Sequence, residues 1–216
     1  LEKRRSHLGF GSDGVSVGAA GKSRRKPLAE FITGLTEMVW EAGVAMRPQA
    51  VKSTSRWKIA SMSLSRFVEK WTTPSYPPAS VLEGDLSAAE QQLGVRFPED
   101  YRQAVLDVGL PRPTIALLNA IVVRGLDLHD LSNFYSPKEI VEETLGWREI
   151  GMPDRLIAIA SDGSGNKFCF NADQLGVDSA DRRGIWFFDH DFGTVDQVAP
   201  SFHAWIDAFC DVEPCH

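Results

Sequence analysis

Cysteine is scarce in this chain of 216 residues, and its three copies follow no paired pattern. Cys169 falls in an expected strand, Cys210 near the end of an expected helix, and Cys215 in the C-terminal tail. An odd number of cysteines without a C-x-x-C pair disfavours both a disulfide framework and a zinc knuckle. The sequence therefore predicts buried, reduced thiols.

Long apolar runs are also missing, and the first residues do not have the pattern of a signal peptide. The longest apolar candidate, Thr114 to Val123, has about half of the roughly 20 residues that span a bilayer, and it contains Asn119. Near the N-terminus, Lys3, Arg4 and Arg5 are followed by glycine and serine rather than by an apolar segment. We therefore expect a cytoplasmic protein with no membrane partner.

Catalytic and cofactor-binding motifs are lacking as well. The sequence has no H-E-x-x-H and no G-x-S-x-G. Residues 9–14 fit G-x-G-x-x-G, but no strand precedes them and no βαβ unit follows. Asp189, His190 and Asp191 offer groups that bind metals, yet one short cluster rarely supplies three converging ligands, and a satisfied polar turn is favoured. We therefore expect that the protein is not an enzyme and that it has no catalytic residue, no bound metal and no cofactor.

Charge is unevenly distributed along the chain. Of the 23 Lys and Arg residues, eleven lie in residues 1–61, together with five of the 29 Asp and Glu residues. That leaves twelve basic and 24 acidic residues in 62–216, so the two parts carry net charges of +6 and −12. Residues 1–26 are rich in Gly, Ser, Lys and Arg and are expected to be disordered. Residues 27–45 have the apolar spacing of a helix, and 47–61 are typical of a linker.

Met62 marks the expected start of the folded domain. Leu64, Phe67, Val68 and Trp71 follow it at the spacing of an amphipathic helix, behind a hydroxyl cap. We therefore expect a chain that begins at this methionine to be as stable as the full chain. The expected organisation is a basic, partly disordered extension over 1–61 with a helix near 27–45, a domain over 62–211, and a tail over 212–216.

A hairpin is the expected centre of this domain. The apolar run from Leu156 to Ala160 indicates a strand buried on both faces, and the alternation from Lys167 to Asn171 indicates a second strand. The residues between them, 162–166, are typical of a tight turn. Residues 115–123 fit either a strand or a buried helix. A helix is expected to begin at a capping box of Ser87 and Glu90 and to end at Gly94. Further helices are expected behind caps at Ser136 and Ser201 and from Pro98, and further strands at 184–189 and 195–199.

Four motifs, in this order, resemble the signatures of one family. Leu93–Arg102 is similar to L-G-x-x-L-P-x-D-Y-R, and residues 156–166 are similar to I-x-I-A-x-D-G-x-G-N. Asp189–Asp191 and Ser201–Ile206 are similar to the closing D-H-(D/E) and S-F-x-x-(W/F)-(L/I) of the same pattern. Over about residues 62–211 the chain resembles the SUKH superfamily, of the Smi/Knr cell-wall-assembly-regulator type.

The resemblance implies a single α+β domain with one bent, largely antiparallel sheet and helices packed against it. In bacteria such domains are typically immunity proteins that bind and neutralise a co-encoded toxin, often a nuclease, and this is the expected function. In fungi the family points to a regulatory scaffold in a signalling or cell-wall pathway, which is the alternative. The motif residues expected to be structural are Gly94, Pro98, Asp100, Tyr101, Asp162, Gly163, Gly165, Asn166, Asp189, His190, Phe202 and Trp205.

The acidic surplus of residues 62–216 has two interpretations. Net charge keeps a protein soluble. Alternatively, an acidic face mimics a nucleic-acid backbone and enters the basic groove of a nuclease, where complementary charge speeds encounter to about 10⁸–10⁹ M⁻¹s⁻¹ at low salt. The same charge disfavours direct nucleic-acid binding. Glu139, Glu142 and Glu143 share one helical face by their spacing. The expected partner-binding residues are Glu139, Glu142, Glu143, Glu149, Asp178 and Asp181.

Overall fold

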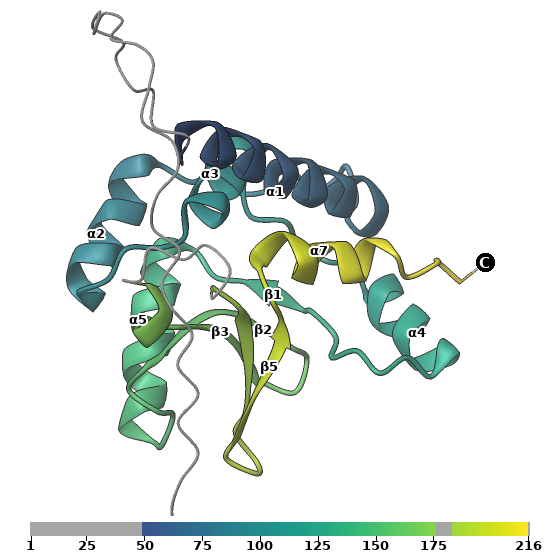
Figure 1. Ribbon diagram of the computed structural model, residues 1–216. Helices are drawn as coiled ribbons and strands as arrows, with labels where there is room; N and C mark the ends of the chain where they lie inside the picture. Colours follow the sequence, from purple (N-terminus) through teal and green to yellow (C-terminus); the bar gives the residue numbers. More distant parts are fainter. Residues whose placement is uncertain (1–48, 176–182, 216) are drawn as a thin grey trace, which may run out of the picture. The chain divides into compact units, whose positions relative to one another are not determined.

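The computed structural model describes residues 49–175 and 183–215 (Figure 1). The helix expected over 27–45 lies outside the described residues. The elements, in chain order, are α1 (Gln49–Trp71), α2 (Glu83–Leu93), α3 (Glu99–Val108), α4 (Ile115–Arg124), β1 (Asn133–Phe134), α5 (Pro137–Glu149), β2 (Leu156–Ser161), β3 (Lys167–Asn171), α6 (Ala172–Leu175), β4 (Ile185–Asp189), β5 (Thr194–Ala199) and α7 (Phe202–Cys210).

The strands form one five-stranded sheet in the order β1-β2-β3-β4-β5, and every neighbouring pair is antiparallel. The expected hairpin is β2–β3, with Leu156 opposite Asn171 and Ser161 opposite Lys167. Because helices are added to an open antiparallel sheet, the prediction of an α+β fold is confirmed.

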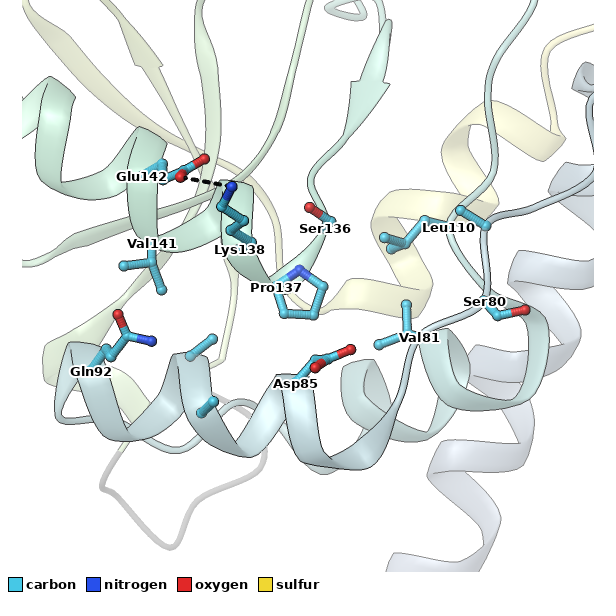
Figure 2. Close-up of a pocket in the computed structure, with 13 residues that line it drawn as sticks. Ser80, Val81, Asp85, Gln92, Leu110, Ser136, Pro137, Lys138, Val141 and Glu142 are labelled. Atoms are coloured by element: carbon cyan, nitrogen blue, oxygen red, sulfur yellow. Dashed lines mark ion pairs between the residues drawn. The ribbon is translucent and has the colours of Figure 1, made fainter.

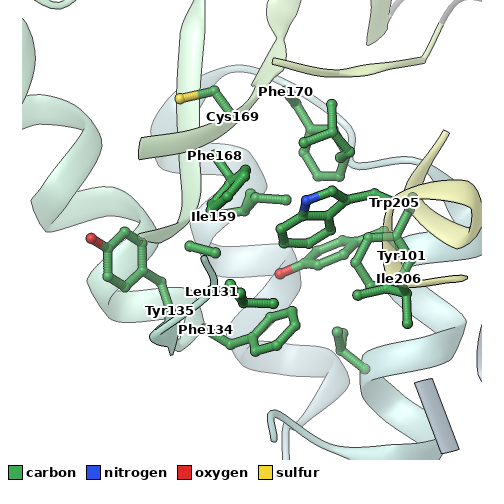
Figure 3. Packing of buried hydrophobic residues seen from close by; sticks show 14 of the residues in the cluster. Tyr101, Leu131, Phe134, Tyr135, Ile159, Phe168, Cys169, Phe170, Trp205 and Ile206 are labelled. Atoms are coloured by element: carbon green, nitrogen blue, oxygen red, sulfur yellow. The ribbon is translucent and has the colours of Figure 1, made fainter. Parts of the chain in front are cut away.

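The central strands are buried on both faces, as the apolar run of β2 predicted. On one face of β3, Phe168 contacts Trp205 of α7 at 4.9 Å between ring centroids, and Phe170 contacts Tyr101 of α3 at 5.2 Å (Figure 3). On the other face, Lys167 reaches α5. Alternate residues of β3 therefore contact helices on opposite faces of the sheet.

Helix α1 holds the C-terminal helix in place. The indole of Trp71 donates a hydrogen bond to the carbonyl of Phe209 at 2.8 Å, and the ammonium of Lys70 donates to the carbonyl of Cys210 at 2.8 Å. Both bonds satisfy carbonyls at the end of α7 that have no partner within that helix. Phe67 packs edge-on against Phe209 in the same layer.

Three of the predicted helix boundaries are confirmed by their capping geometry. Gly94 ends α2 with φ at 67°, a left-handed value that glycine adopts without strain. Ser136 and Glu139 form a reciprocal capping box at the start of α5. Ser201 accepts the amide hydrogen of Ala204 and begins α7.

Three helix starts differ from the predictions. The described part of helix α1 begins at Gln49, so Met62 lies inside the helix. Residues 49–61 of the expected linker are therefore helical. Helix α2 begins at Glu83, four residues before the predicted cap, and the hydroxyl of Ser87 donates to Glu83 within the helix. The acidic side chains in the first turn of α2 interact favourably with the positive end of the helix dipole, and no hydroxyl caps this helix. Pro98 is the N-cap of α3 rather than its first residue.

The ambiguous segment after residue 114 forms helix α4, which is buried on one side only. Leu117, Ala120 and Ile121 point into the core, whereas Ile115, Val122 and Val123 are exposed. Among the described residues, none of the helices combines the length and the apolar character that a bilayer crossing requires.

Removing residues 49–61 is expected to destabilise the domain. The sequence alone led us to expect that a chain beginning at Met62 would be as stable as the full chain. The deletion shortens α1, removes the fully buried Ala60, and breaks the 2.9 Å hydrogen bond from Ser61 to Asp107. We expect a chain that starts at Met62 to unfold about 2–6 °C below one that starts at Gln49, the equivalent of about 1–2 kcal/mol at this size. Thermal unfolding measures the difference, and equal melting temperatures would show that this part of α1 adds nothing.

Candidate functional site

The turn of the β2–β3 hairpin is closed by Asp162. Its carboxylate accepts hydrogen bonds from two backbone amides at 2.9 and 2.8 Å and from the side-chain amide of Asn166 at 2.8 Å. The amide of Gly163 donates to Asp130 at 2.9 Å, and a Cβ at that glycine would lie 3.3 Å from the same carboxylate. Gly165 has a φ of +96°, which side chains rarely tolerate. The turn is therefore a filled, self-satisfied structure.

The Asp189–Asp191 segment is tied to this turn. Asn166 Oδ1 accepts the amide hydrogen of His190 at 3.1 Å and lies 2.7 Å from its Nδ1. Asp189 Oδ1 accepts from the amides two and three residues farther along, which is the geometry of a polar turn. Within the described ranges, no three His, Cys, Asp or Glu side chains are grouped so that they could hold a metal ion.

A buried lysine lies between the sheet and α5. Lys167 is 5% exposed, and its ammonium donates hydrogen bonds to Tyr135 Oη at 2.8 Å and to Glu143 Oε2 at 2.9 Å. The same ammonium lies 4.6 Å from the centroid of the Trp147 ring and 5.3 Å from that of Tyr135. The indole of Trp147 also donates to Glu143 at 3.1 Å. These four side chains, Tyr135, Glu143, Trp147 and Lys167, are called the lysine network below.

The protonation states of the lysine network follow from its contacts. Burial acts to lower the pKa of Lys167, but the hydrogen bonds with Tyr135 and Glu143 outweigh it and raise this pKa above the ordinary lysine value. Burial raises the pKa of Tyr135. The ammonium therefore stays charged and the phenol neutral at neutral pH, so Lys167 is neither a general base nor a nucleophile there.

The predicted acidic residues separate into different environments. Glu143 belongs to the lysine network, and Glu139 is part of the capping box of α5. Glu142 is exposed and pairs with Lys138 at 3.4 Å, and Glu149 is exposed at the end of α5. Asp178 and Asp181 lie outside the described residues. Of the four that the structure describes, Glu142 and Glu149 are exposed and take no part in the capping box or the lysine network.

A cleft lies between α2 and α5, close to Glu142. Its volume is about 590 Å³ (Figure 2). Small and apolar side chains from both helices and from the segment before α2 make up most of its lining, together with the charged side chains of Asp85, Lys138 and Glu142. The lining residues are Ala79, Ser80, Val81, Asp85, Ala88, Ala89, Gln92, Leu110, Ser136, Pro137, Lys138, Val141 and Glu142. We call this feature the α2–α5 cleft.

The corner from α2 into α3 is stabilised by an ion pair that the sequence did not indicate. Glu90 accepts the amide hydrogen of Phe97 at 2.7 Å and pairs with Arg102 at 2.7 Å. Arg102 also pairs with Glu83, so one buried guanidinium joins both ends of α2 to α3. The sequence assigned Glu90 to a capping box with Ser87 because the S-x-x-E spacing fitted one.

The remaining motif residues of α3 and α7 lie in the core. Asp100 accepts the amide hydrogen of Tyr101 at 2.9 Å. The ring of Tyr101 meets that of Phe202 at 5.2 Å, and burial raises the pKa of its phenol. Phe202 and Trp205 are about 1% exposed, so these aromatic residues contribute to packing.

The two buried thiols, Cys169 and Cys210, are poor nucleophiles. Burial raises the pKa of Cys169, and burial likewise raises the pKa of Cys210 to about 11. Both are therefore protonated at neutral pH, and a thiol reacts through its thiolate. Cys215 is exposed in the C-terminal segment.

These features define an α+β domain whose polar motif residues stabilise turns and whose hollow surface lies between two helices. Residues 80–208 match the model of the SMI1 / KNR4 family (SUKH-1), and the chain belongs to this family. The resemblance inferred from the four motifs is therefore confirmed. A search of curated protein sequences gave no match.

Replacing Glu143 by Gln is expected to destabilise the fold far more than replacing Glu142. E143Q leaves the buried ammonium of Lys167 without its counter-charge, and hydrogen bonds to charged groups contribute about 1.5–3 kcal/mol. E142Q removes a surface pair that contributes about 0–1 kcal/mol. Urea unfolding measures the free energy of unfolding of both variants. Equal losses would show that Glu143 contributes no more to stability than an exposed ion pair does.

Proposed function

We propose that this domain is an immunity-type protein that binds a cognate toxin, such as a nuclease, and blocks it without forming a covalent bond. The observation that carries the proposal is the α2–α5 cleft, whose lining is mostly small and apolar and includes two acidic side chains and one lysine. Membership of the SMI1 / KNR4 family supports it, since bacterial domains that resemble this family typically act as immunity proteins.

The chemistry of the cleft indicates what it would take. Val81, Leu110 and Val141 contribute apolar surface. Asp85 and Glu142 contribute negative charge, and Lys138 pairs with Glu142 at 3.4 Å, so Asp85 is the acidic side chain of the lining without a paired lysine there. A toxin segment with apolar side chains flanked by lysine or arginine matches both features. The net charge of −12 on residues 62–216 adds long-range attraction for a basic partner, and such attraction acts chiefly on the rate of association.

We further propose that binding, rather than catalysis, is the activity. The carboxylates and imidazole of the motif residues are engaged in turns, and the lysine network is buried and ion-paired. The regulatory scaffold of the Smi/Knr type is the alternative function, which membership of the same family supports equally. The two differ in the partner: a toxin with one cognate inhibitor, or several components of a pathway.

Co-expression with the product of the neighbouring toxin gene tests the proposal. We expect the domain to restore growth to cells that produce the toxin and to form a complex that survives gel filtration at moderate salt. If growth is not restored and no complex forms, the immunity proposal fails. Stable complexes with several unrelated pathway proteins, in the absence of a toxin gene, would favour the scaffold instead.

Charge reversal in the cleft is expected to weaken toxin binding. The double variant Asp85→Lys/Glu142→Lys replaces two acidic side chains of the α2–α5 cleft, and we expect the association rate to fall about tenfold or more at low salt. The matched control is Asp196→Lys, an exposed acidic residue of β5 outside the cleft. Binding kinetics at two salt concentrations provide the measurement. Equal rates for the double variant and the control would place the interface elsewhere.

A further inference from the structure

Helix α4 presents an uncharged, apolar face to solvent. This face consists of Ile115, Ala116, Asn119, Val122, Val123 and Leu126, the last of which follows the C-cap; the exposed Arg124 lies on another side of the helix by its spacing. Four of them are large: Ile115 is 68% exposed, Val122 67%, Val123 74% and Leu126 39%. The outward side of a surface helix is normally polar, and a contiguous exposed apolar patch marks an interaction site. We call these six residues the α4 stripe.

We propose that the α4 stripe is a self-association surface on which a second copy of this chain packs its own α4 in the antiparallel direction. This inference is independent of the proposed function. It concerns residues that do not line the α2–α5 cleft.

The helix is held in a fixed orientation, so the stripe is a persistent feature of the monomer surface. Leu117, Ala120 and Ile121 anchor the inner side of α4 in the core. At its C-terminal end, Arg124 donates hydrogen bonds to the carbonyls of Glu213 and Pro214 at 3.0 and 3.2 Å. Figure 1 shows α4 near the C-terminal end of the chain, at the edge of the folded unit.

The pattern of charges around the stripe points to a second copy as the occupant. Arg112 lies three residues before α4 and Asp127 three residues after it, and both are exposed. Within the described ranges, neither has a hydrogen-bond or ion-pair partner. Because one lies before the helix and the other after it, an antiparallel pair of α4 helices with its two-fold axis between Asn119 and Ala120 brings the arginine of each copy to the same end of the pair as the aspartate of the other. Such an isologous contact is self-complementary.

The apolar residues follow the same symmetry. With the axis between Asn119 and Ala120, Ile115 of one copy lies at about the level of Val123 of the other, and the central part of each stripe meets its own equivalent. The dipoles of the two helices then oppose each other, which is favourable. A cationic or anionic partner would gain nothing from a stripe without charge, whereas like-charged copies of this acidic domain repel each other at most other surfaces.

The size of the stripe sets the expected affinity. Helix α4 has ten residues and is therefore about 15 Å long. A stable dimer buries about 800 Å² on each partner, and two short helices alone bury less. We therefore expect a reversible dimer whose population rises with concentration in the micromolar range.

Sedimentation equilibrium of the full chain over a series of concentrations tests the proposal. We expect the weight-average mass to rise towards twice the monomer mass, and Val122→Asp to raise the dissociation constant about tenfold or more because it buries an unpaired charge. The control is Leu145→Asp, which changes an exposed leucine of α5 in the same way and should leave the equilibrium unchanged. Thermal unfolding verifies that both variants fold. A wild-type chain that stays monomeric, or an equal response of the two variants, overturns the proposal.

Charge exchange tests the antiparallel register. Arg112→Asp and Asp127→Arg should each weaken association, and the double variant should restore it because each copy again offers one charge of either sign. Neither residue has a role in the described core, so folding should be unaffected. If the single variants associate as the wild type does, or if the double variant is no better than either one, the antiparallel register is wrong.

Discussion

The buried ammonium of Lys167 fixes how α5 lies on the sheet. A charge in the interior is tolerated only where its hydrogen bonds and counter-charge are supplied in good geometry, because its lost hydration costs several kcal/mol. Glu143 of α5 supplies the counter-charge and one hydrogen-bond acceptor, and Tyr135, just after β1, supplies a second acceptor. The ion pair therefore determines which side of α5 faces β3. Residues next to each other in a helix point about 100° apart, so turning Glu143 inward leaves Glu142 in the lining of the α2–α5 cleft.

The backbone of β2 reinforces the same arrangement. The pairing of β2 with β3 is irregular between Ala158 and Ala160, where an extra residue interrupts the ladder. The hydroxyl of Thr144 in α5 accepts the amide hydrogen of Ala158 at 3.0 Å, which provides that amide with a partner from the helix layer. The carbonyl of Ile159 accepts from the amide of Tyr135 at 3.0 Å. The irregular strand thus holds both α5 and the segment before it.

Local patterns in the sequence predicted the parts of the fold that depend on local chemistry. The apolar run of β2, the polar turn, the Ser136 capping box and the Gly94 helix end are set by neighbours along the chain, and each was found. The start of α2 was missed because Glu90 fitted a capping box with Ser87, whereas it pairs with Arg102 across the corner. The start of α1 was missed because a serine-rich, basic segment has weak helix signals, and in the structure it continues a helix that the core stabilises.

The candidate site was less predictable because it depends on contacts between distant segments. Spacing placed Glu139, Glu142 and Glu143 on one helical face, but spacing cannot tell which of them meets a buried lysine 24 residues away. The α2–α5 cleft left no local signal, since its lining combines small residues such as Ala88 and Ala89 with side chains from separate elements. The sequence of α4 did carry a signal for an exposed apolar surface. The stretch before Arg124 has no charge, is too short to span a membrane, and has apolar residues on every side of the helix.

The two surfaces proposed here differ in the kind of partner that each rejects. The net charge of −12 on residues 62–216, to which Asp85 and Glu142 contribute, disfavours self-association at the α2–α5 cleft through like-charge repulsion. The α4 stripe lacks the charge that would attract a basic toxin, and its apolar side chains match an equally uncharged surface. Under both proposals, the domain would bind a toxin and a second copy of itself through separate surfaces. A dimer joined through α4 would carry two clefts, which raises the effective concentration of the second once the first has bound a multivalent target.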